Sequence, residues 1–409
     1  MLKKLTIFLF ISIFLLSCSK RTDTDVSYFL YETENNKIII TGFTGSDTDI
    51  IIPKKIDNLP VAVIGNRAFE RKNLTSVVIP NSVTHIETWA FSCNQLKNIT
   101  IPKSVTHIGS DAFAVNEFTK IIIPASVIHI GDFAFRLNSI QDVTIPNSVA
   151  YIGRQAFSEN QLKSVIIPNS VTYIGPYAFS NNQLTRITIS ASVTQITEGS
   201  FMDNKLTSVT IPGSVTHIEN WAFANNLLTS VTIPRSVDFI GNSAFGGNKL
   251  ASITLPNNII ISPFSFNALV YEKYNQEDKK AGTYNITFSK FKDFEIAILD
   301  NSLIEIYKYT GSNKDIIIPE RISNLPVIAA GFSSFAELRI TSLILPNTLI
   351  YIGSNAFGEN FLENVIIPDS VTHIGDGAFY FSRLEDVIIP NSVIYIDEYA
   401  FDCNVIKSP

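Results

Sequence analysis

The chain has 409 residues, of which 45% are hydrophobic and only 17% are charged, and its 31 Lys and Arg against 37 Asp and Glu give a net charge of −6. This composition excludes a disordered chain, because it supplies enough apolar surface for a large core. The sequence has no basic tract, which argues against a nucleic-acid-binding protein.

The first residues have the pattern of an export signal. Two lysines precede an apolar run over residues 5–16, which is too short to span a bilayer as a helix. The run ends in Leu-Leu-Ser-Cys at residues 15–18, which resembles a bacterial lipobox. We therefore expect residues 1–17 to be a lipoprotein signal peptide and Cys18 to carry the lipid, although an ordinary signal peptide that contains a cysteine is the alternative. The polar segment up to residue 35 is expected to tether the fold to the membrane.

A repeat of 22 residues dominates the rest of the sequence. Prolines recur at this step from Pro80 to Pro256, and phenylalanines do so from Phe69 to Phe245; a second block of both begins near residue 335. Only Ser190 breaks the first proline column. A fixed period of this length is typical of solenoids, in which stacked coils bury one continuous core.

One unit reads Leu-x-x-Val-x-Ile-Pro-x-Ser-Val-Thr-x-Ile-Gly-x-x-Ala-Phe-x-x-Asn-x, as in residues 162–183. Its spacing predicts a short strand that a proline ends, a second extended segment, and a corner filled by Ala-Phe. The expected inward side chains in this coil are Leu162, Val165, Ile167, Val171, Ile174 and Phe179. We therefore predict an all-β-rich repeat solenoid of the leucine-rich-repeat type, with 22-residue coils, short strands and turn or 3-10 segments.

Two further columns concern the corners of the coil. An asparagine recurs in most units, as at Asn160 and Asn182, and we expect it to adopt a left-handed backbone and to hydrogen-bond its own turn. Cys93 and Cys403 share one repeat position in distant coils, so we expect small buried side chains that form no disulfide.

The repeats fall into two blocks that begin with similar units. Residues 36–69 and 302–335 share Thr-Gly, Ile-Ile-Ile-Pro and Asn-Leu-Pro-Val segments, which indicates caps that cover an exposed strand edge. We divide the chain into a tether at 18–35, a cap unit at 36–73, a first array at 74–256, a cap or insert at 257–300, a second cap-like unit at 301–339 and a second array at 340–409. The insert could form a β-hairpin around Ala281-Gly282. No closing cap is apparent after the second array, whose last coil could fray, pair with a partner or reflect a truncated gene.

The run Ile-Pro-x-Ser-Val-Thr-x-Ile-Gly-x-x-Ala-Phe resembles the BspA-like, or treponemal-type, leucine-rich-repeat family of bacterial surface proteins, over about residues 36–409. The segment at 279–284 is also similar to a stretch that follows such arrays in treponemal lipoproteins. The resemblance implies a place on the cell surface, with the outer membrane expected, and adhesion to host matrix proteins or to other bacteria. It implies no catalytic residues.

A candidate binding face follows from the first strand, because the residue between its two inward positions should point outward. This column consists of Val78, Thr100, Ile122, Thr144, Ile166, Thr188, Thr210, Thr232, Thr254, Ile344, Ile366 and Ile388. A flat surface of threonine and isoleucine suits protein binding, and the isoleucines make the second block the more apolar one. A solvated surface selected for strand propensity is the alternative.

All five histidines share another repeat position, at His85, His107, His129, His217 and His373. Imidazoles about 5 Å apart could bind zinc or copper. The same column carries Tyr, Phe and Gln in other coils, however, and no recurring Asp or Glu orients the histidines, so a half-exposed aromatic stack is favoured. We expect no metal and no other cofactor.

No motif of a hydrolase, metalloprotease or nucleotide-binding enzyme occurs, and the departures from the repeat at Ser190, Gln195, Thr197 and Glu198 form no acid–base set. We expect no enzyme activity. The sequence predicts an exported, lipid-anchored bacterial surface protein that binds host or bacterial surface proteins through its β face. The alternative is a structural envelope protein without a soluble ligand, which associates with itself through the C-terminal edge.

Overall fold

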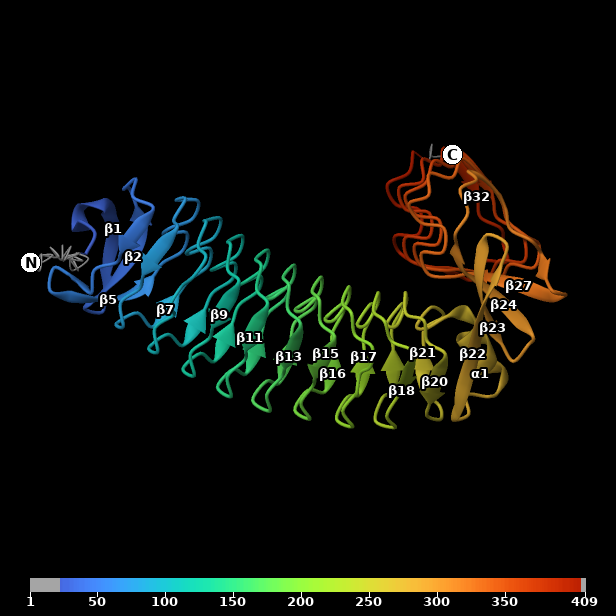
Figure 1. Cartoon of the computed structure of the whole chain (residues 1–409), viewed down its shortest axis with the longest axis horizontal. Coiled ribbons are helices and arrows are strands. Elements are labelled where there is room, and N and C mark those ends of the chain that lie inside the picture. The colour runs from blue at the N-terminus through green and yellow to red at the C-terminus, as the bar shows by residue number, and fades with distance from the viewer. Residues whose placement is uncertain (1–22, 406–409) are drawn as a thin grey trace, which may run out of the picture.

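The computed structural model describes residues 23–405, so the predicted signal peptide and Cys18 lie outside the described residues. Coils of the chain stack along one long axis, and a second, shorter stack turns away at the far end (Figure 1). Within residues 23–405 the one α-helix is α1 (Ala268–Gln276) and the one 3-10 helix is η1 (Val26–Tyr28). The predicted leucine-rich-repeat solenoid is confirmed.

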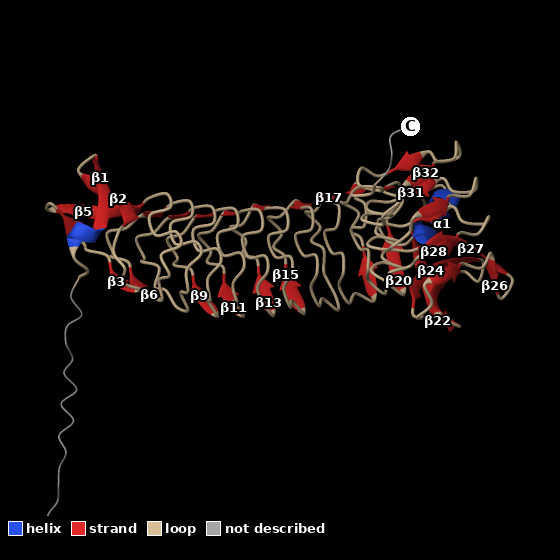
Figure 2. Ribbon diagram, turned by 90° about the horizontal axis from the view of Figure 1, so that it is seen from above, coloured by secondary structure: helices blue, strands red, loops and turns tan. Residues whose placement is uncertain are grey.

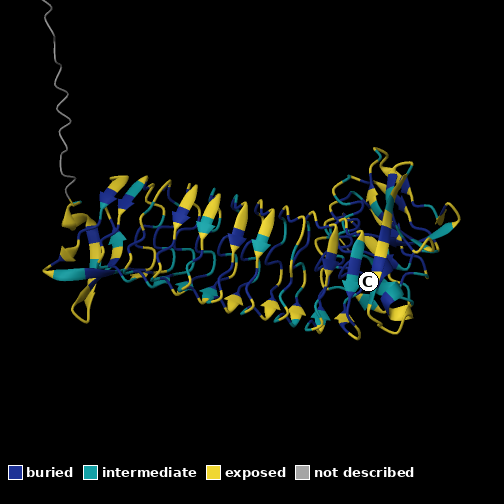
Figure 3. Cartoon of the chain, turned by 60° about the horizontal axis from the view of Figure 1, so that its bottom comes forward, coloured by how far each residue is buried: buried dark blue, intermediate teal, exposed yellow. Residues whose placement is uncertain are grey.

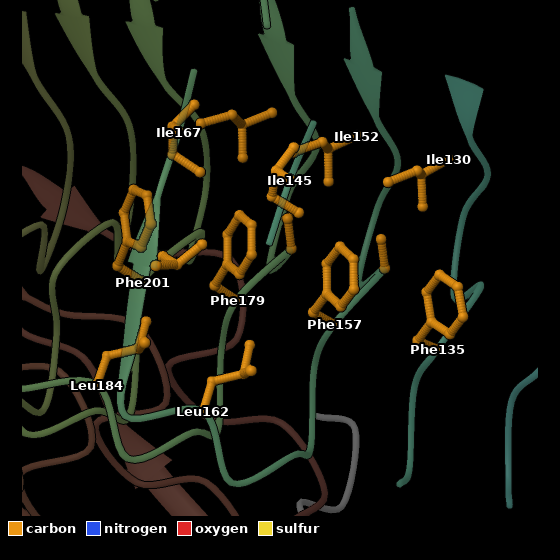
Figure 4. Packing of buried hydrophobic residues seen from close by; sticks show 14 of the residues in the cluster. Ile130, Phe135, Ile145, Ile152, Phe157, Leu162, Ile167, Phe179, Leu184 and Phe201 are labelled. Carbon is orange, nitrogen blue, oxygen red and sulfur yellow. The ribbon is translucent and has the colours of Figure 1, made fainter. Parts of the chain in front are cut away.

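Most coils contribute two short strands, which turns connect. In residues 162–183 these strands are β13 (Ser164–Ile166) and β14 (Tyr173–Ile174). The amide of Val171 donates to the carbonyl of Pro168 at 3.1 Å and closes the turn between them. All six side chains expected to point inward in this coil are buried, and Figure 4 shows Leu162, Ile167 and Phe179 in a common interior with their counterparts in neighbouring coils.

The second strands of successive coils form the longer parallel ladders. In the first array they are β7 (His85–Ile86), β8 (His107–Ile108), β10 (His129–Ile130), β12 (Tyr151–Ile152), β14, β16 (Gln195–Ile196), β17 (His217–Ile218), β19 (Phe239–Ile240) and β21 (Ile260–Ile261). The register is direct, so that His107 pairs with His129 and Ile108 with Ile130. Identical repeat positions therefore lie side by side.

The first strands pair only two at a time. They are β3 (Asp49–Ile51), β6 (Ser76–Val78), β9 (Lys120–Ile122), β11 (Asp142–Thr144), β13, β15 (Arg186–Thr188), β18 (Ser230–Thr232) and β20 (Ser252–Leu255). β3 pairs with β6, β9 with β11, β13 with β15, and β18 with β20. Most of this side of the solenoid is therefore a series of two-stranded ribbons rather than one continuous sheet (Figure 2), and only the pair of β18 and β20 continues into a larger sheet.

The corner phenylalanines form a ladder of stacked rings through the core. The rings of Phe157 and Phe179 lie 5.5 Å apart with an interplanar angle of 5°, and those of Phe135 and Phe157 lie 5.3 Å apart. Each stacked aromatic pair contributes about 0.5–1.5 kcal/mol beyond the burial of its surface. Gly175 allows neighbouring corners to come this close, because a Cβ there would clash with the backbone of Gly153 and Arg154.

The asparagine column hydrogen-bonds its own turn, as expected, and also reaches the preceding coil. The Oδ1 atom of Asn182 accepts the amide of Leu162 at 2.9 Å, and its Nδ2 donates to Phe157, Phe179 and Ser180 carbonyls at 2.9, 3.3 and 3.0 Å. The left-handed residue is the preceding one, Asn181, with φ of 52°. The expected hydrogen bonds to the local turn are confirmed. The expected left-handed backbone of Asn182 was wrong, because the turn places that conformation one residue earlier.

The N-terminal cap is a hairpin of β1 (Phe29–Glu34) and β2 (Lys37–Phe43), followed by β4 (Lys55–Ile56) and β5 (Leu59–Ile64). β1 pairs antiparallel with β2, and β2 runs parallel to β5, which continues into the ladder. Phe29 is only 3% exposed and belongs to the core. The structure therefore places β1 in the cap rather than in the tether expected at 18–35.

The insert between the arrays contains α1, β22 (Gly282–Phe291) and β23 (Phe294–Leu299). β22 pairs antiparallel with β20 and covers the end of the first array. The expected hairpin at Ala281-Gly282 was wrong: Gly282 begins a strand, and the hairpin turns between Phe291 and Phe294. Part of the polar segment that precedes β22 forms the helix α1. This helix was not predicted, because the segment has no repeat pattern.

The second array begins on β23, which pairs with β24 (Leu303–Tyr309) in a hairpin that resembles the N-terminal cap. Its other strands are β25 (Asp315–Ile317), β26 (Arg321–Ile322), β27 (Leu325–Ala330), β28 (Ser342–Ile344), β29 (Tyr351–Ile352), β30 (Asn364–Ile366), β31 (His373–Ile374), β32 (Asp386–Ile388) and β33 (Tyr395–Ile396). This array folds back over the end of the first one (Figure 1).

The two cysteines of the arrays are free, as expected, but they are not buried. Cys93 is half-buried and Cys403 is exposed. Both occupy the left-handed position before the asparagine, with φ of 56° and 57°. Their side chains consequently point away from the core.

Removal of the asparagine side chain should destabilise the solenoid. We expect Asn182→Ala to lower the free energy of unfolding by about 1–3 kcal/mol or more, because it leaves buried backbone groups of two coils without partners. Urea denaturation followed by circular dichroism measures the change. The exposed neighbour Gln183→Ala is the matched control and should change stability by less than about 0.5 kcal/mol; equal effects of the two variants would contradict this role.

Glu305 of β24 should make stability depend on pH. It is 3% exposed, and the amide of Ala268 at the start of α1 donates to its Oε2 at 2.9 Å. Burial raises the pKa of its carboxyl group from 4.5 to about 8, against the opposing effect of the helix amides. The fold thus binds this proton more tightly than the unfolded chain does, and the resulting stability is lost as pH rises towards about 8.

We therefore expect Glu305→Gln to gain stability relative to the wild type as pH rises from about 4.5 to about 8, with little further change above that range. Urea midpoints of both proteins across this range measure the difference. A difference that stays constant with pH would show that the carboxyl group does not titrate in this way.

Candidate functional site

The predicted face lies along one side of the solenoid, on the ribbons of first strands. Figure 3 shows exposed residues alternating with buried ones along these strands. In β13, Val165 is 2% exposed whereas Ile166 is 69% exposed. Val78, Ile122, Ile344, Ile366 and Ile388 are 44%, 70%, 56%, 85% and 79% exposed, and the threonines at 100, 144, 188, 210 and 232 are exposed as well. The outward orientation of the column is confirmed, while its role in binding stays a prediction.

Three positions modify this face. Thr100 and Thr210 lie in segments that form no strand, so the two-stranded ribbons on either side of each segment are not joined there. Thr254 is only half-exposed, because β22 pairs with its strand and the Oγ1 atoms of Thr254 and Thr283 lie 2.9 Å apart. The threonine face of the first array therefore ends at β20.

The second array has an additional member that the sequence analysis missed. Ile317 of β25 pairs directly with Ile344 of β28 and is 68% exposed. It belongs to the cap-like unit, which does not follow the 22-residue step, and so it escaped the column. We define the isoleucine strip as Ile317, Ile344, Ile366 and Ile388.

A groove runs along the face of the first array where the ribbons are interrupted. It has a volume of about 1230 Å³ and lies between the segments around Thr100 and Ile122, and Lys103 is among its lining residues. A second hollow of about 410 Å³ is lined by several of the same residues and by Lys120. An open groove lined by aliphatic and basic side chains suits an extended protein segment better than a small enclosed ligand.

The histidine column forms the expected aromatic stack on the other ladder. The rings of His85 and His107 lie 4.9 Å apart, and those of His129 and Tyr151 lie 4.5 Å apart. The Nδ1 atom of His107 is 2.9 Å from Oγ1 of Thr106. Burial lowers the pKa of His129, and the neighbouring His107 lowers it further. In the part of the chain that the structure describes, no three His, Cys, Asp or Glu side chains are placed to hold a metal ion.

Among the described residues, no helix has the length and apolar character needed to cross a bilayer. The structure therefore offers no evidence for a helical span within residues 23–405.

Comparison with protein families identifies the repeat. The model described as a BspA type leucine rich repeat region matches overlapping segments at 36–138, 62–183, 106–229, 222–329 and 329–408. The chain belongs to the BspA-type leucine-rich repeat family. The resemblance inferred from the Ile-Pro-x-Ser-Val-Thr repeat is confirmed, while a search of curated proteins gives no match.

The chain is also similar to solved structures of leucine-rich repeat proteins. A leucine-rich repeat protein from Bacteroides ovatus is 21% identical, with a TM-score of 0.50, over 92% of this chain and 90% of that one. A leucine rich cell surface protein from Faecalibacterium prausnitzii is 22% identical, with a TM-score of 0.35, over 95% and 94%. A leucine rich repeat protein from T. pallidum is 24% identical, with a TM-score of 0.31, over 56% and 91%. At these identities the first of them supports the fold alone.

Proposed function

We propose that this BspA-type repeat protein is an exported, lipid-anchored bacterial surface protein that binds host or bacterial surface proteins through its β face. The observation that carries the proposal is the isoleucine strip, in which the four side chains are 56–85% exposed. A strip of large aliphatic side chains on one face is the kind of surface that usually marks a binding site.

The register of the strip supports a protein ligand. Ile317 lies directly beside Ile344, and Ile366 lies directly beside Ile388, so the side chains form a flat row. Complete burial of one exposed isoleucine contributes roughly 1.5–3 kcal/mol, and several together suffice for a protein interface even after the cost of association.

The export pattern at residues 1–18 supports the proposed location. Cys18 would receive the lipid, and the cap would begin a short distance beyond it, so that the array extends away from the membrane surface. With a net charge of −6, long-range electrostatics would favour basic partners.

Exposed aliphatic residues near β33 favour the alternative, a structural protein that associates with itself. Ile394 and Ile396 are 78% and 43% exposed. Exposed apolar residues on a strand can pair with another copy of the chain. Such pairing would build filaments or envelope assemblies without a soluble ligand.

Charge on the isoleucine strip should weaken binding. We expect residues 19–409 to bind immobilised matrix proteins or bacterial cells saturably, and the variant Ile344→Glu, Ile366→Glu, Ile388→Glu to lose at least about tenfold in affinity, because each glutamate would be desolvated without a partner. Surface plasmon resonance against a panel of matrix proteins measures the loss.

The control carries the same number of charges at exposed aliphatic positions outside the face, as Leu227→Glu, Ile128→Glu, Ile260→Glu. Unchanged binding in the strip variant would remove the proposed face. Absence of any saturable binding, together with concentration-dependent assembly in sedimentation velocity experiments, would instead favour the structural role.

A further inference from the structure

A second site lies where the two arrays meet, apart from the β face. A cleft of about 510 Å³ opens between the corners of four adjacent coils of the first array and three of the second. Its walls include Tyr177, Glu198 and Trp221 on one side and Asp376, Asp397 and Tyr399 on the other. These residues all belong to the Ile-Gly-x-x-Ala-Phe corner of their coils, so equivalent corners face each other across the cleft. Figure 1 shows the second array standing over this end of the first.

Hydrogen bonds between the arrays fix the width of this inter-array cleft. Nδ2 of Asn242 donates to the hydroxyl oxygen of Tyr395 at 2.6 Å and to Oδ2 of Asp397 at 2.7 Å. The hydroxyl of Ser243 donates to that of Ser354 at 2.8 Å in a buried contact. Phe332 of the second array packs edge-on against Trp221, with ring centroids 5.6 Å apart. The cleft is therefore preorganised.

The cleft is strongly acidic. Glu198, Asp376, Asp397 and Glu398 line it, and its lining contains no Lys, Arg or His. Burial first, and then the nearby carboxylates of Asp397, Glu198 and Glu398, together raise the pKa of Asp376 to about 6. The carboxylates thus lie close enough to repel one another, and a bound cation would relieve that repulsion.

Two oxygen atoms of the lining lack a hydrogen-bond partner. Oδ1 of Asn242 is one of them, on a side chain that is only 8% exposed, and Oδ1 of Asp376 is the other. The orientation of the Asn242 amide follows from its neighbour, because the carboxylate of Asp397 can only accept. Buried acceptors without partners are rare in folded proteins and are costly, so a donor from a ligand would stabilise this site.

The size and the aromatic walls indicate an organic cation rather than a metal ion. No cluster of three ligating side chains suited to a metal occurs between residues 23 and 405. Tyr177, Trp221 and Tyr399 instead line the cleft with aromatic side chains, against which a cation at the end of an aliphatic chain can pack. Glu198 and Glu398 are exposed at the mouth, where they would attract such a group from solution.

We propose that the inter-array cleft binds the side chain of a lysine or arginine from an extended segment of another protein. The ammonium or guanidinium group would donate hydrogen bonds to Asp376 and Asn242, while its aliphatic stem packs against Trp221. The backbone of the ligand stays outside the cleft, which is open to solvent. The isoleucine strip takes no part in this site, so the proposal is independent of binding at the β face.

Tryptophan fluorescence tests the site directly, since the chain contains only Trp89 and Trp221. In residues 19–409 with Trp89→Phe, we expect a capped tetralysine peptide to change the emission of Trp221 saturably. The same peptide with acetylated lysines should have no effect, because it lacks the charge. Spermidine provides the comparison with a free polyamine.

The variant Asp376→Asn, Glu398→Gln, made in the same background, should weaken tetralysine binding at least about tenfold. The control Glu32→Gln, Glu34→Gln removes two exposed charges from β1, far along the array, and should change affinity less than about twofold. Circular dichroism and urea midpoints establish that each variant folds.

Equal weakening in both charge variants, or the absence of a saturable response from Trp221 in the unaltered cleft, would overturn the proposal. Tighter binding of spermidine than of tetralysine would assign the cleft to a free polyamine and overturn the peptide ligand. The titration of Trp221 fluorescence with tetralysine uses the unaltered cleft. It therefore still tests the proposal if a charge variant does not fold.

Discussion

The whole structure depends on backbone groups of one coil finding their partners in the next. A coil of this length has too little apolar surface to fold alone, and several of its corner amides, such as that of Phe179, donate to carbonyls of the next coil. Asn182 illustrates the solution, because its one side chain bonds to backbone groups of two consecutive coils. The stacked phenylalanines follow from the same register. Once the coils are in register, the side chains at each repeat position form a row along the solenoid. Any surface that the arrays present is built from such rows.

This constraint explains why so much could be predicted from the sequence. A residue that recurs at a fixed step occupies the same place in every coil, so its direction relative to the core, inferred for one coil, applies to the others. Ile166 therefore points outward and Val165 inward, as the spacing predicted, and His129 joins a stack with its neighbours. The family assignment rests on the same regularity, because the matching motif is the row pattern itself.

The features that could not be predicted depend on the segment in which the 22-residue repeat is interrupted. The helix α1 and the hairpin of β22 and β23 belong to the aperiodic insert, whose packing depends on tertiary contacts such as that between Ala268 and Glu305. The cleft could not be predicted either, because Glu198 and Asp376 come together only through the angle that this insert imposes. The sequence does mark these corners as unusual, since Thr197 and Asp397 occupy a position where most coils have glycine. Nothing in the sequence, however, shows that the corners of these two coils face each other. In the asparagine column the hydrogen bonds to the local turn were predicted correctly, but the left-handed conformation falls one residue earlier, at Asn181.

Register is therefore the central claim, and cysteine cross-linking between coils tests it most directly. Ile166 and Thr188 are paired in adjacent coils, where the spacing of about 4.8 Å falls within the Cα separation of about 4.4–6.8 Å that a disulfide requires. With Cys93 and Cys403 replaced by Ser, mild oxidation of the Ile166→Cys, Thr188→Cys variant should form the intramolecular disulfide, as read by peptide mass spectrometry. The Ile166→Cys, Thr210→Cys variant, at about twice the spacing, should remain reduced. A disulfide in the second variant but not in the first would contradict the register. It would also contradict the alignment of equivalent side chains in rows along the solenoid.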